Sequence, residues 1–99
     1  MVVRTKAENI RSFSNTIDRL SFELERLGVE LKKSKATGRV FDNVIANLLN
    51  ISSNSYAISK NRDKIPYYEI VLLASKKEYS GISLSYVFLC VYNEEEKSV

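Results

Sequence analysis

Residues 10–31, IRSFSNTIDRLSFELERLGVEL, carry the most regular pattern in the sequence. Apolar residues recur there at alternating spacings of three and four, which is the a/d repeat of an amphipathic helix. Most positions between them are charged or polar, and no proline interrupts the stretch. We therefore predict a long helix over residues 6–34, whose apolar seam consists of Ile10, Phe13, Ile17, Leu20, Leu24, Leu27 and Leu31.

Gly28 is the one residue of this stretch that favours an earlier helix end, because glycine commonly closes a helix in a Schellman turn. Leu31 nevertheless keeps the heptad phase beyond Gly28. We predict that the helix continues through Gly28. The alternative is that the helix closes there and leaves residues 29–31 extended.

The length of this helix bears on assembly. A helix over residues 6–34 would span roughly 43 Å at 1.5 Å per residue, whereas a compact domain of this size has a diameter of about 33 Å. Part of the seam would then face water unless a second chain covered it, and Phe22 adds an apolar side chain on the opposite side. This predicts a non-enzymatic, self-associating interaction protein, a homodimer, that uses the seam and Phe22. The alternative is that the seam faces the second helix and the sheet of its own chain and that Phe22 is incidental.

The remainder of the chain predicts a second helix and then strands. Residues 40–51 have apolar side chains at helical spacing, and from residue 55 the pattern changes to the alternation typical of strands. Residues 67–74 and 82–92 predict two strands, and residues 55–60 are a candidate third. Residues 93–99 form an acidic tail.

The expected fold is therefore a single α+β domain over residues 1–99. It consists of a long N-terminal helix, a second shorter helix and a β region over residues 55–92, arranged as a two- or three-stranded antiparallel β-meander.

A basic cluster without any acidic residue follows the predicted long helix, and the chain as a whole has a net charge of +3. The cluster consists of Lys32, Lys33, Lys35 and Arg39. Contacts from these side chains to phosphates would give a weak, sequence-independent nucleic-acid binder, which is the alternative function. The structural alternative is that cations near the C-terminus of a helix stabilise it through the helix dipole.

Several kinds of chemistry are excluded by composition. The chain has no histidine and one cysteine, which rules out imidazole-based catalysis, imidazole metal sites and a disulfide framework. Cys90 lies in an apolar segment, so we predict a buried structural thiol. We expect no enzymatic activity, no catalytic residue, no metal or other cofactor, and infer no small-molecule substrate. No apolar run is long enough to span a membrane, and the first residues lack the apolar core of a signal peptide, so the expected location is intracellular.

The sequence as a whole resembles the small orphan proteins of crenarchaeal filamentous viruses. The features that carry this resemblance are its length of 99 residues, the absence of Gln and His, the many Ile, Tyr, Lys and Glu residues, and a leucine seam followed by a tyrosine-rich region. The resemblance implies a viral and archaeal setting with the host cytoplasm as the location. It implies no particular activity, because the function of most such proteins is unassigned.

Overall fold

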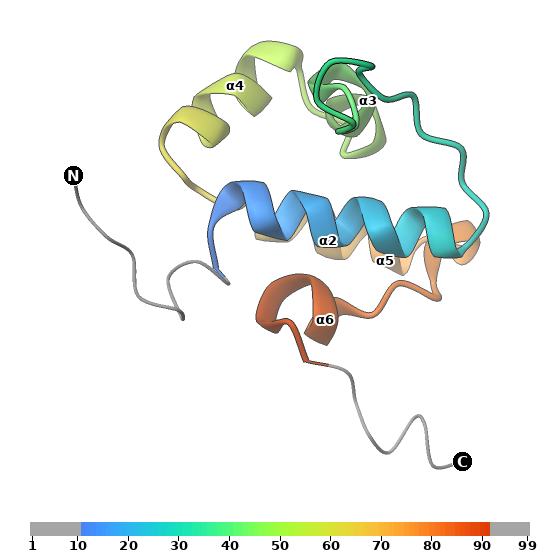
Figure 1. Cartoon of the computed structure of the whole chain (residues 1–99). Coiled ribbons are helices and arrows are strands. Elements are labelled where there is room, and N and C mark those ends of the chain that lie inside the picture. Colours follow the sequence, from blue (N-terminus) through green and yellow to red (C-terminus); the bar gives the residue numbers. More distant parts are fainter. Residues whose placement is uncertain (1–10, 92–99) are drawn as a thin grey trace.

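The computed structural model describes residues 11–91, and the regular structure of this part of the chain is helical (Figure 1). The helices are α2 (Phe13–Arg26), α3 (Asp42–Leu48), α4 (Ser53–Asn61), α5 (Tyr67–Ser75) and α6 (Leu84–Leu89), with a short 3-10 helix η1 (Lys77–Tyr79) between α5 and α6. The described residues contain no β-strand, and their only β-type pairing is an isolated bridge between Lys33 and Val40. The predicted α+β class, with its β-meander over residues 55–92, is therefore wrong.

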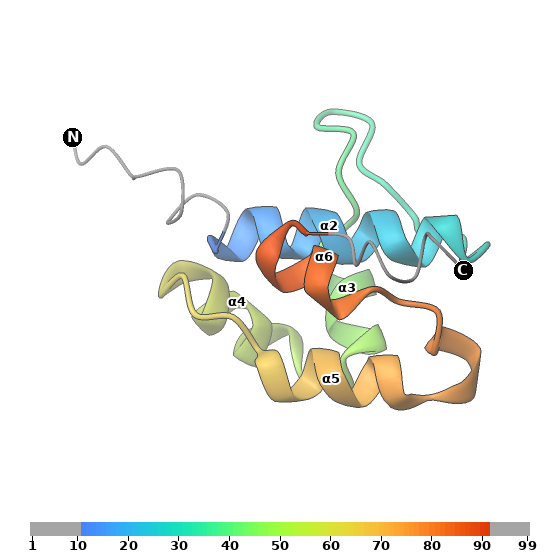
Figure 2. The ribbon, with the colours of Figure 1, turned by 90° about the horizontal axis from the view of Figure 1, so that it is seen from below.

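Helix α2 forms the centre of the arrangement. In Figure 1, α3 and α4 lie above α2, α6 lies below it and α5 runs behind it. In Figure 2 the molecule is seen from below, so that α6 is in front and α5 lies along the lower edge. Every α-helix contributes side chains to one hydrophobic core around α2. The buried apolar residues are Phe13, Ile17, Leu20, Leu24, Ile45, Ala46, Leu49, Tyr56, Ile65, Ile70, Leu73, Ile82 and Val87.

Both ends of α2 are fixed by local hydrogen bonds. At the start, the Ser12 side chain accepts a hydrogen bond from the backbone N–H of Asn15, as an N-cap residue does. At the other end, the N–H of Gly28 donates to the carbonyl of Glu25 and the N–H of Val29 donates to the carbonyl of Leu24, each at 3.0 Å. These two bonds, with Gly28 at φ +91°, make a Schellman motif.

The prediction that the helix continues past Gly28 is therefore wrong, and the alternative of closure at Gly28 is confirmed. Leu31 keeps the heptad phase in the sequence but lies in the loop that follows. Of the predicted helix over residues 6–34, the structure has Phe13–Arg26, and residues 6–10 lie outside the described residues.

The predicted second helix over residues 40–51 is confirmed in a shorter form as α3, Asp42–Leu48. It begins after Phe41 and closes at Asn50, whose φ of 58° is left-handed. The N–H of Ile51 then donates to the carbonyl of Ala46 at 3.0 Å, which repeats the closing bond of α2 with asparagine in the place of glycine.

The region predicted as strands forms α4, α5 and α6 because local signals at the helix starts prevail. Ser52 and Ser83 each accept a hydrogen bond through the side chain from the N–H three residues later, and Pro66 precedes the first turn of α5. The candidate third strand at residues 55–60 lies within α4, and the acidic tail at residues 93–99 lies outside the described residues.

Candidate interaction surface

The apolar seam of α2 packs against the other helices of its own chain. Its four members inside the helix are buried, with exposed fractions of 8% or less, while Leu27 and Leu31 are half-buried against the same core. The four are Phe13, Ile17, Leu20 and Leu24, and Ile10 lies outside the described residues. A partner chain could reach this seam only by displacing these helices, so the seam itself offers no open surface for the predicted self-association.

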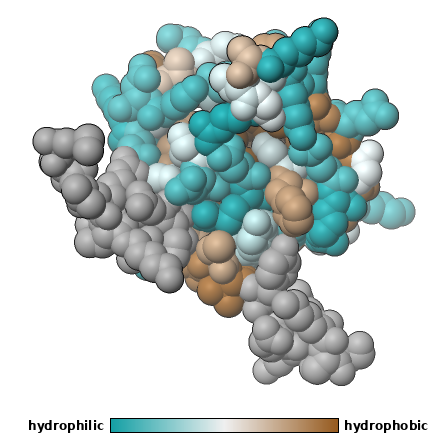
Figure 3. Space-filling model, in the orientation of Figure 1, coloured by the Kyte–Doolittle hydropathy of each residue, from teal (hydrophilic) through white to brown (hydrophobic). Residues whose placement is uncertain are grey.

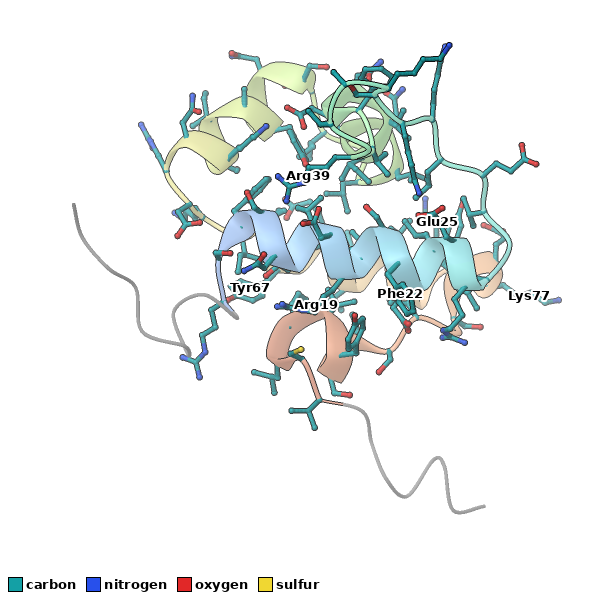
Figure 4. All side chains as sticks on the ribbon, viewed as in Figure 1. Arg19, Phe22, Glu25, Arg39, Tyr67 and Lys77 are labelled. Atoms are coloured by element: carbon teal, nitrogen blue, oxygen red, sulfur yellow. The ribbon has the colours of Figure 1, made fainter. Side chains whose placement is uncertain are left out.

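Phe22 lies on another side of α2 and is 51% exposed. Its ring meets the ring of Tyr86 edge to face, with centroids 5.8 Å apart. Figure 4 shows Phe22 and Arg19 on the side of α2 that faces α6. Phe22 therefore covers part of α6 as well as facing solvent.

The outward side of α5 is an apolar surface that sequence reasoning missed. Tyr67, Tyr68, Val71 and Leu72 are between 44% and 71% exposed, whereas Ile70 and Leu73 on the opposite side are buried. At 100° per residue the four exposed side chains lie within one half of the helix circumference, and none of them is charged. We call these four residues the α5 face. Because residues 67–74 were predicted as a strand, the helical grouping of these side chains was not visible.

Further apolar residues are exposed at the end of α6, next to the α5 face. The ring of Phe88 lies 5.0 Å from that of Tyr67, edge to face, and the following Leu89 and Val91 are more than half exposed. In Figure 3, brown hydrophobic surface gathers around the end of α6 beside the grey atoms. Cys90 is exposed in this segment, so the prediction of a buried thiol is wrong.

Buried charged groups hold α6 onto α2. The Glu23 side chain is fully buried, and its carboxylate accepts hydrogen bonds from Nε and Nη2 of Arg26, each at 3.0 Å, and from the backbone N–H of Ser83 at 2.7 Å. Further along α2, Nε of Arg19 donates to the carbonyl of Val87 at 2.8 Å. Together these bonds tie the start and the middle of α6 to one side of α2.

The ionisation of Glu23 follows from these contacts. Burial raises the pKa of its carboxyl, but the hydrogen bonds from Arg26 and Ser83 and the positive charge of Arg26 together lower the pKa by more. The pKa therefore lies below its ordinary value of 4.5, and the group is a carboxylate at neutral pH. This explains how a fully buried acid is tolerated beside the core.

The predicted basic cluster lies on the loop between α2 and α3, which projects from the helices in Figure 2. Lys33 pairs with Glu25 at 2.9 Å, and Arg39 forms an ion pair and a hydrogen bond with Asp18. Lys32 and Lys35 are exposed and have no ion pair with any residue between 11 and 91. Acids of α2 therefore neutralise half of the cluster.

A hollow of ≈ 510 Å³ separates this loop from α2 and α4. Its apolar wall includes Phe13 and Tyr56, and burial raises the pKa of the Tyr56 hydroxyl. At the rim, Lys60 pairs with Asp42 at 3.0 Å. The other rim pair is Arg39 with Asp18, so the charges at the rim cancel in pairs.

Two other kinds of site are absent from the described part of the chain. No group of three or more His, Cys, Asp or Glu residues between positions 11 and 91 could hold a metal ion. In the same part of the chain, no helix has the length and apolar character needed to cross a membrane.

No protein-family model matches the sequence, and neither the curated proteins nor the solved structures include a significant match. The resemblance to small viral proteins therefore stays a prediction, and the function has to be inferred from the surfaces of the molecule itself.

Proposed function

We propose that this chain is a non-enzymatic, self-associating interaction protein that forms a homodimer through the α5 face. The observation that carries the proposal is the grouping of four apolar side chains, all about half exposed or more, on one side of a helix that has a single charged residue, Glu69. A helix that is apolar on all sides is normally covered on all sides. Only one half of α5 is covered by the described residues of its own chain.

The α5 face is large enough to form the centre of an interface. From their exposed fractions, its four side chains present on the order of 400 Å² to solvent, which is comparable to the largest apolar patches on monomeric proteins. Standard interfaces bury about 800 Å² per partner, so this face is the centre of an interface and neighbouring residues complete it. Such a dimer is expected to be of modest affinity.

A second copy of the chain fits the α5 face for a reason of symmetry. In a twofold dimer the same surface packs against itself, so any charge near the axis would meet a like charge. The α5 face has no charged side chain although the chain as a whole carries a net charge of +3. Two α5 helices could therefore pack together across a twofold axis without like-charge repulsion at the centre.

Nucleic-acid binding is the second candidate function, and fewer residues support it. It rests on the projecting loop, where Lys32 and Lys35 are the two cations of the cluster without an ion pair among the described residues. Two phosphate contacts per chain would give a shallow salt dependence, with a slope of about −2 in log K against log salt. No binding to a DNA duplex at low salt would exclude this function.

Sedimentation equilibrium of the wild type and two variants tests the proposed function. The wild type should reach twice its mass of 11.3 kDa in the micromolar range. Leu72→Glu places a charge in the α5 face and should leave a monomer with unchanged helix content by circular dichroism. Phe41→Glu, at an exposed aromatic residue beside α3, is the matched control and should dimerise normally. A wild type that stays monomeric at all accessible concentrations would refute the proposal.

A further inference from the structure

A groove runs between α4 and the start of α5, with a volume of ≈ 560 Å³. Its floor is apolar and includes Ile58, Ile65, Pro66 and Tyr68. Ile58 and Tyr68 are both exposed, so the groove is open to solvent. An apolar channel of this kind fits a short extended segment with aromatic or aliphatic side chains.

The rim of the groove is basic. Arg62 and Lys64 lie in the turn between α4 and α5, are exposed, and form no ion pair with any residue in the described range. Asp63 lies between them in sequence. Its carboxylate accepts a hydrogen bond at 2.8 Å from the backbone N–H of Phe13, the first residue of α2. Glu69 is the one acid that lines the groove among the described residues. The occupant that fits is apolar at one end and acidic along its length.

We propose that this groove binds the C-terminal segment of the same chain, residues 92–99. The segment reads YNEEEKSV, with one aromatic residue followed by three consecutive glutamates. Tyr92 would occupy the apolar floor, and Glu94, Glu95 and Glu96 would lie along the rim formed by Arg62 and Lys64. The other terminal segment, residues 1–10, has two basic residues against one acidic residue and is therefore a poor match for a basic rim.

The connection between α6 and the groove makes binding within one chain possible. The ring of Phe88 contacts that of Tyr67, which lines the groove, and the described chain continues to Val91. Tyr92 follows Val91 directly, and the three glutamates lie three to five residues beyond Val91, so that in extended form they reach up to about 10–18 Å from it. A tethered segment also has an effective concentration in the millimolar range, which compensates for a small contact area.

Docking of the segment would affect the proposed dimer, but the docking proposal does not require that the dimer exists. Tyr67 and Tyr68 line the groove and also belong to the α5 face. A segment bound in the groove would cover part of that face and compete with a second copy. The C-terminal segment would then weaken self-association, and removal of its charges would strengthen it.

Paramagnetic relaxation in the full-length chain tests the proposal. A nitroxide is attached at position 98 through Ser98→Cys, with Cys90→Ser because Cys90 is exposed, and Leu72→Glu keeps the sample monomeric so that dimerisation has no bearing on the result. The amide signals of Ile58, Arg62 and Tyr68 should lose at least half of their intensity. Those of the loop around Lys35 should change little.

Charge reversals provide the controls. Arg62→Glu with Lys64→Glu should abolish the broadening, and adding Glu94→Lys, Glu95→Lys and Glu96→Lys should restore it. Lys32→Glu with Lys35→Glu removes the same charge elsewhere and should have no effect. Uniform broadening, or broadening unchanged by the first reversal, would overturn the proposal. Broadening seen only between spin-labelled and isotope-labelled chains in a mixed sample would overturn binding within one chain.

Discussion

Helices α2 and α5 are both rich in apolar residues, but α2 buries most of them whereas α5 leaves four of them exposed. In α2 the apolar residues form one stripe that the other helices bury, and the buried Arg19 and Glu23 have hydrogen-bond partners on the α6 side. In α5 apolar residues surround the helix, and the described chain covers one half of it. The difference indicates that α2 organises the fold, whereas α5 leaves an apolar side exposed to solvent, where we propose that a partner binds.

Matched leucine truncations should show the largest difference between the two helices. Leu24→Ala on α2 removes a fully buried side chain and should lower the free energy of unfolding by about 2–5 kcal/mol. Leu72→Ala on α5 removes a side chain that is 46% exposed, and should cost about 1 kcal/mol or less in the monomer. Urea denaturation at a concentration that keeps the chain monomeric measures both. Equal losses would mean that α5 is buried by its own chain in solution.

The next effect in size concerns the buried carboxylate of α2. Glu23→Gln leaves donors of Arg26 and Ser83 facing an amide, and should cost about 1–3 kcal/mol. Glu25→Gln is the matched control, because its side chain is 41% exposed and pairs with Lys33, and it should change stability by about 0.5 kcal/mol or less. A Glu23→Gln variant as stable as the control would contradict the role given to this residue.

The same carboxylate makes stability depend on pH. The folded-state pKa of Glu23 lies below the ordinary value of 4.5, so the folded chain holds this proton less tightly than the unfolded chain. The contribution of Glu23 to the free energy of unfolding is therefore fully present above pH 4.5, and it is lost as the pH falls through the folded-state pKa. Denaturation curves between pH 6 and 3 should therefore show a loss of stability in acid that is smaller in Glu23→Gln. An identical acid response in the two proteins would contradict this assignment.

A smaller effect is expected at the end of α2. Gly28 has a φ of +91°, and no atom lies within 4 Å of the place that a Cβ would take, so Gly28→Ala introduces backbone strain without a clash. It should cost about 1 kcal/mol. Thermal unfolding measures the loss, and Gly28→Asn, which tolerates left-handed backbone better, should lose less. A stable and more helical Gly28→Ala variant would indicate that the helix can extend past this residue.

The same two helices explain how much the sequence alone could predict. In α2 the spacing of Phe13, Ile17, Leu20 and Leu24 has a single period, so a helix was predicted there correctly, although its end and the use of its seam for self-association were not. In α5 the residues YYEIVLLAS are apolar apart from Glu69 and Ser75 and have no clear period, so a buried strand and a helix fit them equally well. Alternation over residues 82–92 was misleading for a related reason, because the cap at Ser83 decides the local structure.

The candidate surface was less predictable than the fold. Self-association was inferred from the length of a helix that the Gly28 turn shortens, so most of its predicted residues lie in or against the core. The residues that the structure leaves exposed on α5 depend on which side of the helix faces α2, α4 and α6. Tertiary packing decides which side of α5 is buried, and the local sequence pattern does not predict it.

The central claim is that two copies of the chain meet through the α5 face. Intermolecular nuclear Overhauser effects, recorded on a mixture of isotope-labelled and unlabelled chains, test it most directly. Contacts between the ring of Tyr68 in one copy and the methyl groups of Val71 and Leu72 in the other are the predicted result. A dimer whose intermolecular contacts involve the methyl groups of Leu20 and Leu24 instead, or the absence of any intermolecular contact, would contradict it.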